Sequence, residues 1–129
     1  MKLIAALLLI AAAPAQAAAG LTVRTGETWL FTIRNGEPAQ ARKVTPSAKI
    51  GKGQIKVSVR LILGTAMTVT NNSPIAYTFR AELISGGKAT VARSCTLPAK
   101  ARPVFEQWEQ KADAVRISDF KVAGAEGHC

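Results

Sequence analysis

The stretch from Gly64 to Leu83 alternates between apolar and polar side chains, and this alternation constrains the fold more than any other feature. Met67 and Val69 share one face, and after Asn71-Asn72-Ser73-Pro74 the alternation resumes and continues to Leu83. A period of two indicates a half-buried strand, because successive side chains leave a pleated backbone on opposite faces. Asparagine, serine and proline favour a turn between such strands. We therefore expect a β-hairpin here, and an all-β fold.

Other segments show the same alternation, although less regularly. Asn35-Gly36 is the pair best suited to a tight hairpin, because both residues tolerate a positive φ. Seven or so short strands, with turn signals every eight to twelve residues, predict a sandwich or a barrel. The further predicted strands are Thr28 to Arg34, Gln40 to Thr45, Gln54 to Leu63, Ala89 to Leu97 and Val115 to Val122.

The segment from Val104 to Ala112 has a different period. Phe105, Trp108 and Ala112 recur at intervals of three and four residues, which is the spacing of one helix face. Pro103 suits a helix start, and a glutamate in the first turn interacts favourably with the helix dipole. We expect one or two helical turns that connect two strands.

The beginning of the chain resembles a secretory signal peptide. Met1-Lys2 is followed by eleven residues without a polar side chain, from Leu3 to Ala13, and then by Pro14-Ala15-Gln16-Ala17. A retained membrane anchor would need about 20 apolar residues. We expect residues 1–17 to be removed and residues 18–129 to form a single domain, periplasmic or secreted, without stable membrane insertion.

The two cysteines, Cys95 and Cys129, predict a disulfide in an oxidising compartment. It would close a loop of about 35 residues and add roughly 4 kcal/mol of stability in the chain-entropy model. A redox pair or a metal site is the alternative. There is no CxxC spacing, however, and the chain has a single histidine, His128.

Positive charge is concentrated before residue 103. After cleavage the chain keeps 16 cations against 8 acids, a net charge of +8. Such a surface favours an anionic envelope polymer, lipid head groups or an acidic protein. Nucleic acid is disfavoured, because the densest basic run lacks aromatic residues for base stacking and the chain is predicted to be exported. Alternatively, the lysines prevent sheet edges from pairing with other molecules. The predicted basic face comprises Arg42, Lys43, Lys49, Lys52, Lys56 and Arg60.

Evidence for catalysis is weak. Glu106, Glu109 and Asp113 would lie on adjoining turns of the predicted helix, next to Lys111, in the pattern of a solvated face. Paired carboxylates perform acid–base chemistry when burial separates their pKa values, and this pattern does not predict such burial. We therefore expect no catalytic residue, no metal site and no cofactor.

Five short motifs carry a resemblance to known proteins: Gly64-Thr65-x-Met67, Asn71-Asn72-Ser73-Pro74, Tyr77-x-Phe79-Arg80, Ser94-Cys95-x-Leu97-Pro98 and Phe105-Glu106-x-Trp108. Together they resemble small exported proteins of alphaproteobacteria that have no assigned function. The asparagine-rich turn before an alternating strand is also similar to immunoglobulin-like envelope modules, including pilus-chaperone-type domains. The resemblance implies a bacterial envelope setting and an immunoglobulin-like fold. Together with the strand pattern, it leads us to expect one antiparallel, immunoglobulin-like β-sandwich of about seven strands with a short helical connector.

These observations favour a non-enzymatic protein that binds an anionic envelope component or an acidic protein through its basic face. A periplasmic inhibitor or assembly accessory that recognises one protein partner is the alternative. Charge reversal at Lys49, Lys52 and Lys56 should separate the two, because it should abolish the first activity and only slow association in the second.

Overall fold

A computed structural model describes residues 20–100 and 102–124, and within them it contains nine β-strands and no helix. All neighbouring strands pair antiparallel. The strands are β1 (Leu21–Arg24), β2 (Thr28–Arg34), β3 (Glu37–Val44), β4 (Ile55–Leu61), β5 (Thr65–Asn71), β6 (Tyr77–Ser85), β7 (Lys88–Ala92), β8 (Pro103–Trp108) and β9 (Ala114–Val122).

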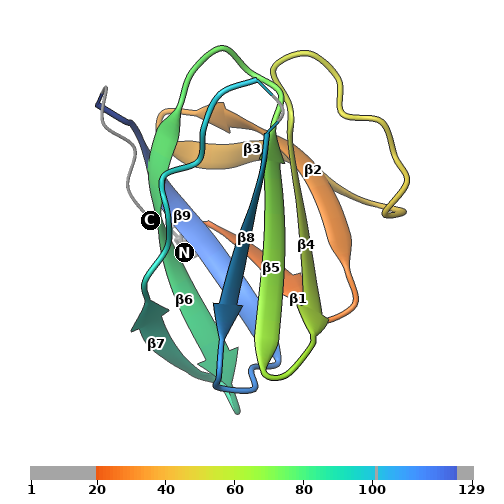
Figure 1. The fold of residues 1–129 in the computed structure, drawn as a ribbon, viewed down its shortest axis with the longest axis vertical. Helices are drawn as coiled ribbons and strands as arrows, with labels where there is room; N and C mark the ends of the chain where they lie inside the picture. Colours follow the sequence, from red (N-terminus) through yellow and green to blue (C-terminus); the bar gives the residue numbers. More distant parts are fainter. Residues whose placement is uncertain (1–19, 101, 125–129) are drawn as a thin grey trace, which may run out of the picture.

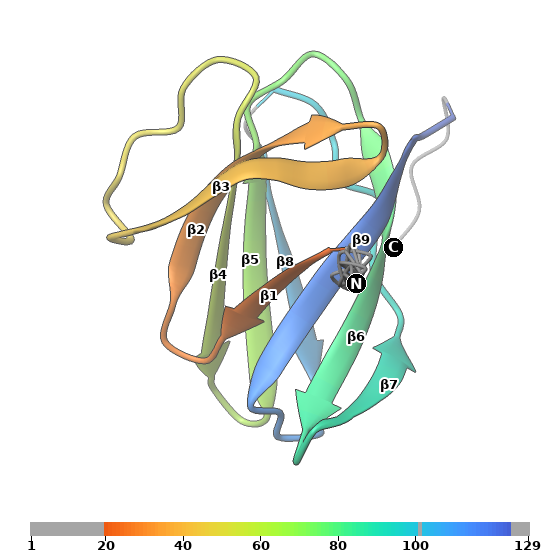
Figure 2. The same cartoon turned by 180° about the vertical axis from the view of Figure 1, so that it is seen from behind.

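The strands form two sheets that face each other, as predicted for a β-sandwich (Figure 1). One sheet has four strands in the order β1-β9-β6-β7, and the other has five in the order β3-β2-β4-β5-β8. Figure 2 shows the four-stranded sheet in front of β4, β5 and β8. The prediction of about seven strands was too low, because β1 and β8 were not recognised as separate strands.

Alternating side chains from both sheets fill the core. The predicted inward face is confirmed for Ile55, Val57 and Val59, but it was wrong for Leu61 and Leu63, which are exposed at the end of β4 and in the turn after it. In β4 and β5 the fully buried residues include Val57, Val59 and Met67, and in β9 they include Ile117. Phe120 joins the two layers, since its ring lies 5.8 Å from the ring of Phe31. Burial of this apolar surface is the main favourable contribution to folding.

The tight turn predicted at Asn35-Gly36 is confirmed. Arg34 pairs directly with Glu37, so the turn between β2 and β3 contains two residues. Asn35 and Gly36 have φ values of 52° and 79°, in the left-handed region that these two residue types tolerate.

The last predicted strand, Val115 to Val122, is confirmed as β9.

The predicted hairpin between Gly64 and Leu83 is wrong, although both of its strands exist. β5 and β6 belong to different sheets, so the intervening turn crosses from one layer to the other. Asn71 stabilises this crossing: its side-chain amide donates to the carbonyl oxygens of Ile75 at 2.7 Å and of Pro98 at 3.2 Å. The alternation was interpreted correctly, but it does not determine which sheet a strand joins.

The predicted helical connector is also wrong, because β8 occupies this segment. Its residues pair with β5, from Thr65 opposite Trp108 to Thr70 opposite Pro103. Hydrogen bonds to the open edge of β5 outweigh the weak helical period. The strand alternation was concealed because the charged side chain of Glu106, which is only 8% exposed, occupies an inward position.

Two predictions concern residues beyond the described ones. The predicted signal peptide, residues 1–17, lies outside them, and so does Cys129. No helix in the described part of the chain is long and apolar enough to cross a membrane.

Candidate binding groove

The outward face of the five-stranded sheet carries a polar surface at β4 and β5. In β4, Lys56, Ser58 and Arg60 alternate with buried residues and therefore point away from the core. Lys56 lies opposite Thr70, and Ser58 lies opposite Thr68. Directly opposed residues of an antiparallel pair share a face, so these hydroxyls and cations form one continuous surface.

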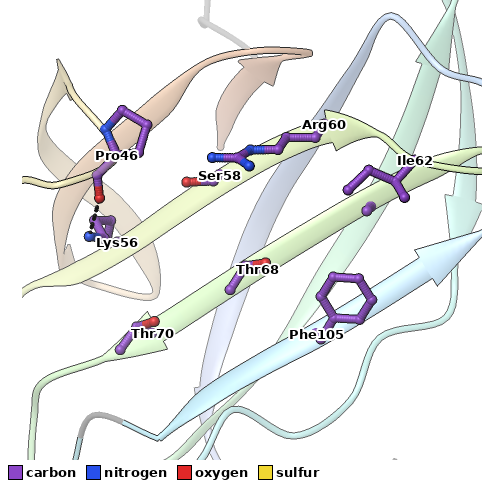
Figure 3. A pocket seen from close by; sticks show the side chains of 9 residues that line it. Pro46, Lys56, Ser58, Arg60, Ile62, Thr68, Thr70 and Phe105 are labelled. Carbon is purple, nitrogen blue, oxygen red and sulfur yellow. Dashed lines mark hydrogen bonds between the residues drawn. The ribbon is translucent and has the colours of Figure 1, made fainter.

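β8 adds an aromatic side chain to this surface. Phe105 lies opposite Thr68 on the same outward face, and it is 56% exposed. Figure 3 shows its ring beside Thr68, on the opposite side of the surface from Lys56. Sequence reasoning missed this neighbour because it placed Phe105 on a helix, and only the pairing of β5 with β8 brings it here.

These side chains enclose a shallow groove of about 370 Å³. Hydroxyl groups from β4 and β5 lie along it, while cations and apolar side chains lie at its margins (Figure 3). The residues that line it are Pro46, Lys56, Ser58, Arg60, Ile62, Ala66, Thr68, Thr70 and Phe105.

Lys56 also holds the loop beside the groove. Its ammonium group donates to the carbonyl oxygens of Pro46 at 2.7 Å and of Ala48 at 3.0 Å. The first of these bonds is drawn in Figure 3. A substitution of Lys56 would therefore disturb the loop as well as the charge, and Arg60 is the better residue to test.

The six predicted basic residues do not share one face. Arg42 pairs with Leu30, which pairs with Lys56, so these two cations lie on the outward face together with Arg60. Lys43 pairs with Trp29 on the opposite face, and its ammonium lies 3.4 Å from a carboxylate oxygen of Glu27. The remaining two, Lys49 and Lys52, are exposed in the loop between β3 and β4.

The groove has an uncompensated positive charge. Within the described residues, neither Lys56 nor Arg60 forms an ion pair with a carboxylate. The side chains of β4, β5 and β8 that face outward include no acidic residue. An anionic group would therefore meet cations and hydroxyl donors here without a repelling neighbour.

The three carboxylates considered for catalysis make separate contacts. Glu106 points inward from β8 and accepts a hydrogen bond from the backbone N–H of Cys95. Burial raises the pKa of Glu106, and that hydrogen bond opposes the increase. Glu109 is exposed, and Asp113 accepts a hydrogen bond from the N–H of Gly86 at 2.9 Å. Among the described residues, no cluster of histidine, cysteine, aspartate or glutamate could hold a metal ion.

Cys95 lies in the connection between β7 and β8, where it is 7% exposed. Its predicted disulfide partner, Cys129, is outside the described residues. The pairing therefore stays a prediction. Intact mass of the purified protein under non-reducing conditions tests it, since a disulfide removes two hydrogens.

The fold and this groove define a class: a two-sheet antiparallel β-protein with a cationic, hydroxyl-lined depression on the outside of one sheet. Comparisons with protein-family models, with curated proteins and with solved structures gave no match. The chemistry of the groove is therefore the basis for a functional proposal.

Proposed function

We propose that this chain is an exported, non-enzymatic binding protein that holds an anionic glycan in the groove of the five-stranded sheet. One observation carries the proposal. Two cations without counter-charges, Lys56 and Arg60, flank a row of hydroxyl groups on a surface that also presents the exposed ring of Phe105.

Each part of the groove matches one part of such a ligand. Arginine and lysine bind carboxylate or phosphate groups through charge-assisted hydrogen bonds. The hydroxyls of Thr68 and Thr70 can each donate and accept, as sugar hydroxyls require, while the hydroxyl of Ser58 already shares a hydrogen bond with that of Thr28 at 2.8 Å. The ring of Phe105 offers an apolar surface to the C–H groups of a sugar.

The spacing of the cations favours a polymer over a small anion. Lys56 and Arg60 are four residues apart on β4, a separation of about 13 Å along an extended strand. With this separation between their Cα atoms, a glycan with repeated acidic groups can place a separate group at each cation, and the weak contacts would then add through multivalency. An acidic protein is the other anionic partner considered, but the hydroxyl row and the aromatic ring favour the glycan.

Two further statements belong to this proposal. The periplasmic or secreted setting rests on the signal-like residues 1–17 and on the resemblance to exported alphaproteobacterial proteins. The immunoglobulin-like character of the sandwich is supported by its two-sheet arrangement, in which the chain crosses between layers after β1, β5, β7 and β8. Export is tested by N-terminal sequencing of protein from the periplasm and medium of an expressing bacterium, since cleavage after Ala17 should give Ala18 first.

The experiment compares two charge reversals that alter the net charge equally. Polygalacturonate serves as the acidic glycan and dextran as the neutral one, with binding measured by calorimetry at low and high salt. Arg60→Glu should weaken polygalacturonate binding about tenfold, because it removes a groove cation. Lys121→Glu, at an exposed position of the other sheet, should change it less than threefold.

A third variant tests the contribution of the aromatic ring in the groove. Phe105→Ala should weaken binding severalfold and leave its salt dependence unchanged, since the ring carries no charge. Equal losses for Arg60→Glu and Lys121→Glu would show that only the net charge matters, which contradicts the groove. Absence of polygalacturonate binding by the parent protein would contradict a glycan ligand. Retention of an acidic protein from an envelope extract would then favour the protein partner.

A further inference from the structure

The turn between β4 and β5 exposes three consecutive large aliphatic side chains. Leu61 is 52% exposed, Ile62 is 46% exposed and Leu63 is 88% exposed. They are three of the seven large hydrophobic side chains that are exposed in the described part of the chain. Scattered exposed apolar residues need no explanation, whereas a contiguous group at one protruding turn indicates an interaction site.

The backbone of Leu63 makes the exposure more significant. Leu63 has a φ of +50°, in the left-handed region that glycine and asparagine adopt readily and leucine does not. A polar or glycine residue would fit this position better both for the backbone and for contact with water. Strained positions that persist in a fold are often functional, and here the strain presents an apolar side chain to solvent.

The turn is also held in one conformation. The side-chain amide of Gln107 donates to the carbonyl oxygens of Ile62 at 2.8 Å and of Leu63 at 3.3 Å. Gly64 has a φ of +108°, and a β-carbon there would collide with the carbonyl oxygen of Trp108. A preordered turn loses little conformational entropy when it docks, so its apolar contacts contribute fully to binding.

Cations lie close to this turn. Arg60 directly precedes it on β4, and Arg24 lines a hollow of about 550 Å³ together with Leu61. Neither arginine forms an ion pair with a carboxylate of the described residues. Among the nearby acidic residues, Glu27 accepts a hydrogen bond from the backbone N–H of Arg24 at 3.0 Å and pairs with Lys43, Asp113 accepts one from the N–H of Gly86, and Glu109 is exposed. Arg24 ends β1 and Arg60 stands next to the last residue of β4, and these two strands end at the same end of the sandwich (Figure 1).

We propose that the turn Leu61–Leu63 docks this protein on the surface of an anionic phospholipid bilayer. Leu63 enters the boundary between headgroups and acyl chains, while Arg60 and Arg24 meet the lipid phosphates. Apolar side chains combined with nearby cations are the combination that binds anionic membrane surfaces. Pairing of this turn with a second copy is disfavoured, because it would bring the unpaired arginines of two copies together.

The docking site overlaps the glycan groove at Arg60 and Ile62, which line both, but it extends beyond the groove at Leu63. Leu63 does not line the groove, and its side chain can be changed without touching a groove residue. The lipid proposal therefore does not depend on the glycan proposal, and a variant of Leu63 separates their outcomes.

The test is flotation with vesicles of phosphatidylcholine, prepared with and without phosphatidylglycerol. The parent protein should bind only the anionic vesicles, and less in high salt. Leu63→Asn should bind them about tenfold more weakly, because it removes the most exposed aliphatic side chain. Asparagine suits a positive φ, so this variant should melt at the same temperature as the parent or higher. Binding to polygalacturonate should not change.

A matched control uses another exposed aliphatic residue. Val122 is 72% exposed and lies at the far end of the sandwich, where it pairs with Tyr77 (Figure 2). Val122→Thr should change vesicle binding less than twofold. Unchanged binding by Leu63→Asn, or no binding by the parent protein, would overturn the proposal. A parent dimer that Leu63→Asn converts to a monomer would also overturn it and identify the turn as a self-association site.

Discussion

The two outer faces of the sandwich differ in how their cations are used. On the four-stranded sheet, Glu82 accepts a hydrogen bond from Arg116 at 2.9 Å and lies 3.6 Å from Arg80. On the five-stranded sheet, Lys56 and Arg60 have no such partner among the described carboxylates. The carboxylate of Glu82 therefore pairs two cations of β6 and β9, whereas the two cations of β4 have no described carboxylate beside them.

The ionisation of Glu82 is consistent with this difference. The hydrogen bond from Arg116 is the largest cause that lowers the pKa of Glu82, and the same bond raises the pKa of Arg116. The net charge of +8 predicted a basic face, but it could not distinguish cations that are paired from cations that are free to bind. Whether the cations are paired depends on Glu82 in β6, since β4 and β5 contain no acidic residue.

The largest expected effect is the removal of the shared carboxylate. Glu82→Ala should lower the free energy of unfolding by about 1.5 kcal/mol, because it removes the shared acceptor of Arg116 and Arg80, whose side chains are 25% and 50% exposed. Urea denaturation measures this loss. Arg60→Ala is the control on the other face and should cost less than about 0.5 kcal/mol. Equal losses in the free energy of unfolding for the two variants would contradict the difference in charge pairing between the two sheets.

A smaller effect on stability is expected at Glu106, the second buried carboxylate, and it should depend on pH differently from that of Glu82. Glu82 pairs with two arginines, whereas Glu106 accepts a hydrogen bond from the N–H of Cys95, forms no ion pair within the described residues and has a pKa raised by burial. Glu106 is protonated in the folded and the unfolded state at low pH. Its contribution to stability therefore decreases as pH rises from about 4.5, the ordinary value, through its raised folded pKa. Glu106→Gln should remove this decrease and stabilise the protein by about 1 kcal/mol at pH 7.

Glu82 should show the opposite dependence. Its folded pKa is lowered, so its stabilisation is complete above pH 4.5 and is lost as pH falls through the lower value. Urea titrations from pH 3 to pH 8 test both carboxylates. A Glu106→Gln variant with the same pH profile as the parent would contradict the assignment of Glu106 as a buried, poorly compensated acid.

The smallest effect on stability is expected on the outward face of the five-stranded sheet. Arg60→Gln should change the free energy of unfolding by less than about 0.5 kcal/mol, because the side chain is exposed and forms no ion pair with a described carboxylate. The same variant should lower polygalacturonate affinity severalfold and flatten its dependence on salt. A marked loss of stability would show that Arg60 has a structural role and is not free for a ligand.

Much of the fold was predictable because its signals are local. The alternation of Ile55, Val57 and Val59 identified a strand and its inward face, and Asn35-Gly36 identified a two-residue turn. These features depend on backbone geometry and on neighbours within a few residues. The all-β class follows from them.

The groove was not predictable in the same way, because its parts meet only through strand pairing. Phe105 reaches Thr68 because β8 adds to the edge of β5, and the period of its own segment favoured a helix. Lys43 and Lys56 belong to one basic run in sequence but lie on opposite faces of the sheet.

The sequence by itself determined which segments extend and which of their side chains are apolar enough to be buried. The tertiary structure alone decided which sheet each strand joins, which cations find a carboxylate and which apolar residues stay exposed at a turn. The physical reason is the separation along the chain over which each kind of interaction acts. Alternation and turn chemistry act between near neighbours, whereas the bond from Asn71 to the carbonyl of Pro98 and the pair of Glu82 with Arg116 join residues far apart in the chain.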